Sequence, residues 1–203
     1  MAKGKDHSHD DTRISESSYM AALAVYKKYD KPQQEASTIR LYVDLPEFRI
    51  GDPGRVYALD LQLIRLDSET GAPRDLQVED SVTTAWSCYY RRNFDTAFSL
   101  LHEARALAQP DDLSGLLDCR LCAGTMYNFR GEMNEAIDEW SDVVELCKKL
   151  GLVRLEAHAD VQLGDWLLVR GNTGDYDHAQ DLLQAACIKQ RILDRSIDRK
   201  SVV

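Results

Sequence analysis

The chain has 203 residues, of which 44% are apolar and 29% are charged, and its formal net charge is −9. This composition is typical of a folded globular protein, and the acidity argues against a nucleic-acid partner, which needs clustered Lys and Arg. The acidity also disfavours binding to an anionic membrane surface, and no apolar run approaches the roughly 18 residues that a membrane span needs.

The N-terminal segment MAKGKDHSHDDTR has no apolar core after its lysines, so it is not a secretory signal. We predict that residues 1–14 form a disordered tail. The five cysteines are odd in number and all fall in helical patterns. Free thiols in a reducing cytosol are the simplest interpretation, which predicts a cytoplasmic protein.

Residues 15–75 are predicted to form an N-terminal helical region. Apolar spacing predicts a helix over Ile14–Tyr29. A second helix, Pro53–Leu66, is predicted after Asp52, because aspartate is a good N-cap and proline suits the first turn. Ser68–Arg74 has the composition of a loop.

This region is also a candidate for a degenerate repeat, because Ala58 lies 39 residues before Ala97, the first marker of the repeats described next. Two features argue against it: Pro46 falls inside the expected first helix, and Leu59, Leu61 and Leu63 alternate as in a strand. We favour a helix over Pro53–Leu66 because the repeats that follow need a helical neighbour.

Residues 76–195 contain a repeat of about forty residues. Ala97, Ala136 and Ala179 are 39 and 43 residues apart and each lies near the start of a helical run. A second series of small residues, Ala85, Gly124 and Gly164, is spaced by 39 and 40. Small residues at one period indicate positions where paired helices cross closely.

Each repeat is predicted to be a pair of antiparallel helices. Residues 196–203, after the last repeat, are predicted to form a tail. Such a pair cannot bury its own apolar face, so neighbouring pairs must stack. The predicted helices are Val78–Arg92 and Phe94–Ala108, then Leu113–Arg130 and Met133–Leu150, then Leu152–Arg170 and Tyr176–Leu193.

These residues resemble the tetratricopeptide repeat (TPR) family, in its longer variety of about forty residues. The second repeat carries Gly124, Tyr127, Gly131, Ala136 and Trp140 at the family's relative positions. The first departs from the pattern, with Arg92 where glycine is usual and Cys88 where tyrosine is preferred. The resemblance implies an all-α solenoid of helix pairs wound in a right-handed superhelix.

The resemblance also implies that the first helix of each pair lines a concave groove. The residues expected in this partner-binding groove are mostly apolar or aromatic. They are Val82, Trp86, Tyr89, Tyr90, Leu121, Thr125, Asn128, Phe129, Gln162, Asp165 and Val169. One subclass of the family grips a chaperone's C-terminal carboxylate with Lys, Arg and Asn on this face, and those residues are missing from the matching positions here. An aromatic lining suits a peptide or amphipathic helix with apolar anchors.

Several motifs contain residue types found in catalytic or metal sites, but each lacks the partners that such a site needs. Cys119 and Cys122 form a CxxC inside a helix, without the second pair of ligands that a structural zinc site needs. His7 and His9 lie in the predicted tail. His102 and His158 are isolated on predicted helices, with no nucleophile placed to form a triad. We therefore expect no enzyme activity, no cofactor and no metal.

Three functions remain open at this point. The first is a non-catalytic scaffold or adaptor that binds a protein segment through the aromatic groove. The second is a regulatory or sensor module of a signalling or transcription-control system that binds a peptide or small molecule. The third is a structural subunit of a homo-oligomer or larger complex, in which some of the aromatic side chains pack internally or against another copy.

Overall fold

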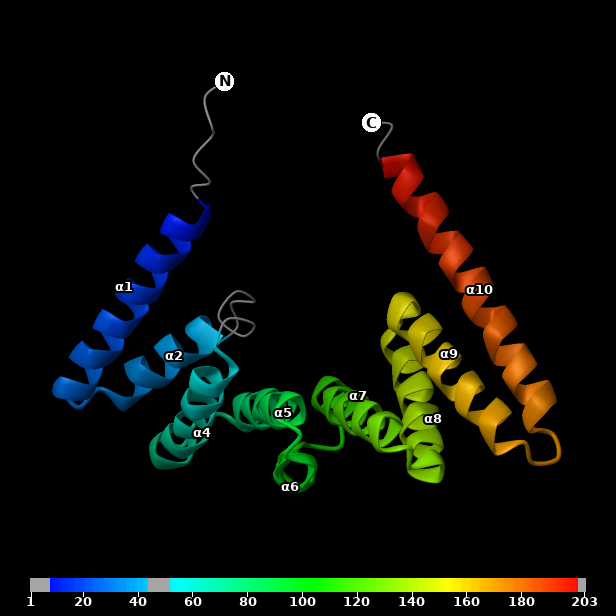
Figure 1. The fold of residues 1–203 in the computed structure, drawn as a ribbon, viewed down its shortest axis with the longest axis horizontal. Coiled ribbons are helices and arrows are strands. Elements are labelled where there is room, and N and C mark those ends of the chain that lie inside the picture. Colours follow the sequence, from blue (N-terminus) through cyan, green and yellow to red (C-terminus); the bar gives the residue numbers. More distant parts are fainter. Residues whose placement is uncertain (1–7, 44–51, 201–203) are drawn as a thin grey trace. The chain divides into compact units, whose positions relative to one another are not determined.

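The computed structural model describes residues 8–43 and 52–200, which form nine α-helices and no strand. The helices belong to two compact units that divide at Leu107. Within each unit, every helix packs against the one before it, so that successive helices form antiparallel pairs (Figure 1). The first unit contains α1 (Ser8–Lys28), α2 (Pro32–Val43), α4 (Pro53–Thr70), α5 (Arg74–Tyr90) and α6 (Phe94–Leu107). The second contains α7 (Leu113–Arg130), α8 (Met133–Leu150), α9 (Val153–Arg170) and α10 (Asp175–Lys200).

The predicted all-α fold of helix pairs is therefore confirmed, and α7 and α8 have the predicted bounds. The loop predicted over Ser68–Arg74 is confirmed only at residues 71–73, because α4 continues to Thr70 and α5 already begins at Arg74. Thr70 lies in the last turn of α4, where its hydroxyl donates to the Leu66 carbonyl at 2.8 Å. Gly71 then ends the helix in the left-handed conformation, with φ of 63°.

The chain ends also differ from the predicted tails. Helix α1 already begins at Ser8, within the stretch predicted to be disordered, and residues 1–7 lie outside the described residues. Helix α10 runs to Lys200 and so includes most of the predicted tail 196–203. Helix α2 lies in the predicted N-terminal helical region but matches no individually predicted helix, and Pro46 lies outside the described residues.

The helix prediction around Ala58 is confirmed, but Ala58 is not equivalent to the alanines of the later repeats. Ala58 is exposed, whereas Ala97 and Ala136 are completely buried. Ala97 and Ala136 are the fourth residues of α6 and α8. The fourth residue of α4 is the buried Val56, so a larger side chain takes that place in the first unit.

The small residues of the three later pairs lie where helices cross closely, as predicted. Ala85 is completely buried in α5. A Cβ atom built on Gly124 would lie 3.1 Å from Cε2 of Trp140, and one on Gly164 would lie 3.1 Å from Cγ of Leu183. These distances bring α7 close to α8 and α9 close to α10, so a larger residue would fit at either position only if the facing side chain moved.

Each unit has its own apolar core. In the first unit Leu23, Ile39, Tyr42, Val56 and Leu63 come together from three successive helices. In the second unit the indole of Trp140 is the largest buried side chain, and it belongs to a core cluster that draws residues from all four helices. The amphipathic helices thus bury their apolar faces against their neighbours, as the repeat pattern requires.

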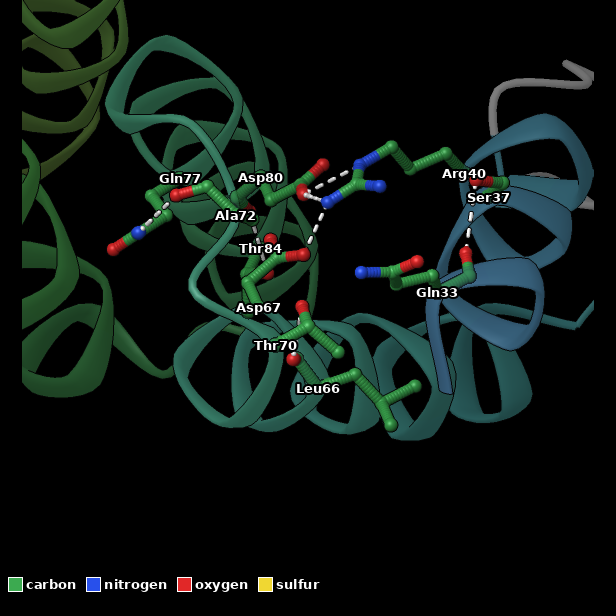
Figure 2. Close-up of polar contacts among 10 residues, drawn as sticks. All are labelled: Gln33, Ser37, Arg40, Leu66, Asp67, Thr70, Ala72, Gln77, Asp80 and Thr84. Atoms are coloured by element: carbon green, nitrogen blue, oxygen red, sulfur yellow. Dashed lines mark hydrogen bonds and ion pairs between the residues drawn. The ribbon is translucent and has the colours of Figure 1, made fainter. Parts of the chain in front are cut away.

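A buried ionic contact joins three helices of the first unit. Arg40 of α2 donates from Nε to Oδ2 of Asp80 on α5 at 2.8 Å, and from Nη2 to Asp67 on α4 (Figure 2). Both carboxyl groups are almost completely buried. Burial raises the pKa of Asp80 to about 8; the neighbouring Asp67 adds to the rise and Arg40 opposes it. One cation therefore faces two carboxyl groups that cannot both ionise cheaply.

We expect this group to make stability depend on pH. Because the pKa of Asp80 is higher in the folded than in the unfolded chain, its stabilising contribution is complete below about pH 4 and is lost as pH rises through about 8. Asp80→Asn keeps a neutral group at this position, so its stability relative to the original chain should increase steadily over that interval. Urea unfolding at pH 5, 6.5 and 8 measures the difference, and a constant difference would contradict the assignment.

Two matched substitutions test the helix crossings. Gly124→Ala should lower the free energy of unfolding by about 1–2 kcal/mol, because the buried Trp140 ring cannot move away from the added methyl group. Gly164→Ala should be close to neutral, because Leu183 is only half-buried and can rotate while alanine gains about 1 kcal/mol of helix propensity. Denaturant unfolding of both variants checks this, and equal losses would be inconsistent with it.

Candidate functional site

The residues predicted to line a partner groove fall on three helices in two units. Val82, Trp86, Tyr89 and Tyr90 lie on α5 of the first unit. On α7 of the second unit are Leu121, Thr125, Asn128 and Phe129, and on α9 are Gln162, Asp165 and Val169. They therefore form two candidate surfaces, one in each unit.

The surface of the first unit is a cluster of aromatic rings at the end of α5. The rings of Trp86 and Tyr89 are 5.7 Å apart, Tyr89 and Tyr90 are 5.3 Å apart, and Trp86 and Tyr90 are 6.4 Å apart. Phe94 of α6 joins the cluster at 6.1 Å from Tyr89. Val82 is buried and does not line the surface. We call Trp86, Tyr89, Tyr90 and Phe94 the α5 aromatic patch.

Local sequence explains why these rings gather. Trp86, Tyr89 and Tyr90 are spaced by three and four residues, which places them on one side of a helix. The helix then stops, because Arg92 adopts φ of 59°, the left-handed conformation that the TPR pattern usually assigns to glycine. The turn brings Phe94 back beside Tyr89. Arg91 lies 5.1 Å from the ring centre of Tyr57 on α4, a cation–π contact that tethers the same turn.

The surface of the second unit is divided between internal and exposed side chains. Leu121 packs against the apolar core, and Thr125 donates to the Leu121 carbonyl at 2.8 Å. Phe129 and Val169 are 47% and 68% exposed. Asp165 is also exposed, and Gln162 is half-buried. Only part of the predicted set on α7 and α9 is therefore available to a partner.

Asn128 is a predicted groove residue whose side chain is engaged in hydrogen bonds within the second unit. Its Oδ1 accepts from the indole Nε1 of Trp140 at 2.9 Å and also from the indole of Trp166. Its Nδ2 donates to Oε1 of Gln162 at 2.6 Å. One side chain thus links α7, α8 and α9 and meets the hydrogen-bonding needs of two indoles.

Other ionic contacts between helices lay outside the sequence prediction. Lys189 of α10 pairs with Glu156 of α9 at 2.7 Å and also with Asp160. Arg120 of α7 pairs with Glu139 of α8 at 3.0 Å. The available signal was an acidic residue at an otherwise apolar helix position, because such a residue is rarely buried without a partner.

Thiol and metal chemistry has little support in the described part of the chain. Cys88, Cys119, Cys122 and Cys147 are buried and Cys187 is exposed. Burial raises the pKa of both Cys88 and Cys147, which disfavours the reactive thiolate. Across residues 16–43 and 52–194, whose side chains the structure describes, there is no cluster of three His, Cys, Asp or Glu side chains able to hold a metal ion. Over the same ranges no helix combines the length and hydrophobicity that crossing a bilayer requires.

Comparison with solved structures identifies the fold. The chain resembles the crystal structure of the nearly identical TPR-like repeats of a predicted kinesin light chain from Podosopora anserina, with a TM-score of 0.52 and 15% sequence identity. A point variant of that protein gives a TM-score of 0.54, also at 15% identity. Each match covers 88% of this chain and 96% of the other. No family model and none of the curated proteins compared matches the sequence. The fold is therefore TPR-like, and the similarity extends beyond the three predicted repeats.

We expect Asn128→Leu to lower the free energy of unfolding by about 2–4 kcal/mol, because it leaves two indole N–H groups without an acceptor. Asn128→Asp is the matched control, since its carboxylate can still accept from both indoles and should cost clearly less. Denaturant unfolding followed by tryptophan fluorescence compares the two variants. Equal losses would mean that the hydrogen bonds to the indoles contribute little.

Proposed function

We propose that this chain is a non-catalytic interaction module that binds a protein segment carrying apolar anchors on the α5 aromatic patch. One observation supports this more than any other: the ring of Tyr90 is 65% exposed while two further aromatic rings lie within 6.4 Å of its own. Contact between water and an exposed aromatic cluster is unfavourable, and a partner that covers the cluster removes this cost.

The chemistry of the patch suits a peptide with apolar side chains. Tyrosine and tryptophan bury a large area at low conformational cost and dominate the energy of many interfaces. Their hydroxyl and indole groups can also donate to the partner's backbone. The rings lie edge to face or tilted, so they present a stepped surface into which single apolar side chains can fit. Arg91 and Arg92 are exposed next to the patch and favour a segment with acidic flanks.

The second unit offers a further apolar surface for a partner. Phe129 at the end of α7 and Val169 near the end of α9 are exposed, and Asp165 adds a carboxylate on the same helix as Val169. The TPR-like fold supports the proposal in general terms, because such repeats present helical surfaces to protein segments. The α5 aromatic patch is nevertheless the main site, because it has the larger aromatic area.

The test removes aromatic rings from the patch. Tyr90→Ala combined with Trp86→Ala should weaken binding of the natural partner at least a hundredfold, since each ring is expected to contribute about 2 kcal/mol or more. The partner is first captured from the native host and identified by mass spectrometry. Calorimetry with the purified partner then measures the affinity of each variant.

Two controls keep the result interpretable. Tyr29→Ala removes an equally exposed tyrosine from the turn after α1, in the same unit, and should leave the affinity unchanged. Tyr90→Ala alone changes an exposed ring, so it should retain the helical circular dichroism spectrum even if loss of the half-buried Trp86 disturbs the fold. Full affinity in the folded Tyr90→Ala and double variants would exclude the patch as the binding site.

A further inference from the structure

The last helix pair, α9 and α10, leaves a groove uncovered along its length. Two adjoining hollows make up this groove, and they share the exposed Cys187 of α10. One hollow, of about 540 Å³, has Leu168, Tyr176, Leu183 and Ile188 among its walls. The other lies between the beginning of α9 and the later part of α10. Tyr176 and Ile188 are 70% and 57% exposed, so the groove presents apolar side chains to solvent.

The preceding pair shows how such a face is covered in this molecule. Helix α9 packs on α8, and its His158 ring lies 5.8 Å from the ring of Trp140. Asn128 of α7 also forms hydrogen bonds with Gln162 and Trp166 of α9. The face of the α7–α8 pair is therefore covered by the next helix along the chain.

The repeat relates this covered face to the open one. Ala136 and Ala179 are 43 residues apart, and that offset matches Trp140 with Leu183 and Val144 with Cys187. Trp140 and Val144 are buried, whereas Leu183 is half-buried and Cys187 is exposed. The α9–α10 groove therefore has the form that receives a helix in this fold, and no described helix fills it.

The charges along the groove indicate what kind of helix would fit. Since α9 and α10 are antiparallel, Arg154 at the start of α9 and Arg191 late in α10 lie toward the same end, with His158 next to Arg154. Among the described residues, neither guanidinium group forms an ion pair, and none of the side chains that line the groove is acidic. This is a local concentration of cationic groups in a chain of net charge −9.

We infer that the α9–α10 groove is a docking site for an amphipathic helix of a partner protein, with apolar residues on one face and carboxylates at one end. The apolar residues would pack on Leu168, Tyr176, Leu183 and Ile188, as a following repeat would. The carboxylates would pair with Arg154 and Arg191, and guanidinium groups form well-oriented pairs with carboxylates. This site is separate from the α5 aromatic patch, so the partner could use either surface alone.

The experiment selects helices against the intact chain. The library consists of phage-displayed peptides with a helix-favouring sequence and 18 residues, the same length as α9. Every position can be apolar, acidic or basic. The expected winners carry apolar residues spaced by three and four and Asp or Glu at one end. Fluorescence anisotropy measures the affinity of a winning peptide. Its binding should slow alkylation of Cys187 by iodoacetamide at least tenfold, and the other four cysteines are buried.

Matched variants locate the bound peptide. Ile188→Glu with Arg191→Glu changes two exposed groove residues and should weaken binding at least tenfold. Ile192→Glu changes an equally exposed isoleucine of α10 that does not line the groove, so it should bind normally. Trp86→Ala with Tyr90→Ala should also bind normally, which separates this result from the test of the proposed function.

Three outcomes would overturn the inference. The first is a selection that gives no enriched peptide or gives peptides without acidic ends. The second is a winning peptide whose affinity is unchanged by Ile188→Glu with Arg191→Glu. The third is a dimer in light scattering in which Cys187 is protected without any peptide, because a second copy of the chain would then occupy the groove.

Discussion

The close crossing of paired helices at a small residue is the constraint on which the rest of this structure depends. Gly124 leaves just enough space for the Trp140 ring, and Gly164 does the same for Leu183. Because the backbones approach so closely, each pair makes a compact layer with an apolar face that the next helix must cover. The burial of Ala97, Ala136 and Ala179 follows from the same requirement, whereas no described helix covers the face of the α9–α10 pair.

Polar contacts then fix which helix packs on which. Arg40 holds α2, α4 and α5 together through two buried carboxyl groups, and Asn128 links α7, α8 and α9 through two indoles. An apolar face tolerates many arrangements, whereas a buried charge or N–H group tolerates only those that supply its partner. Apolar packing alone would allow neighbouring helices to shift along one another. The contacts of Arg40 and Asn128 are satisfied at only one relative position of these helices.

The same reasoning separates internal from external surface. Asn128 and Leu121 lie where the repeat pattern predicts a groove, yet Asn128 hydrogen-bonds to the buried Trp140 and Leu121 packs against the core. Tyr90 and Ile188 are large apolar side chains left in contact with water. Exposed aromatic and aliphatic side chains in clusters, rather than singly, distinguish the α5 aromatic patch and the α9–α10 groove from ordinary surface. Both surfaces suit protein segments, one through aromatic rings and the other through an apolar groove with a cationic end.

The sequence by itself determined the six helices of the three repeats to within a few residues at most ends, the repeat and the small residues at the crossings, because periodicity and helix termini are local properties. It also placed Trp86, Tyr89 and Tyr90 on one helix face. It missed α2 and the true extents of α1 and α10. Only the tertiary structure decided which faces are covered, since Asn128 meets Trp166 across 38 residues and Arg40 meets Asp80 across 40. An amphipathic pattern shows that a helix needs a neighbour, but the identity of that neighbour depends on contacts between residues far apart in the chain.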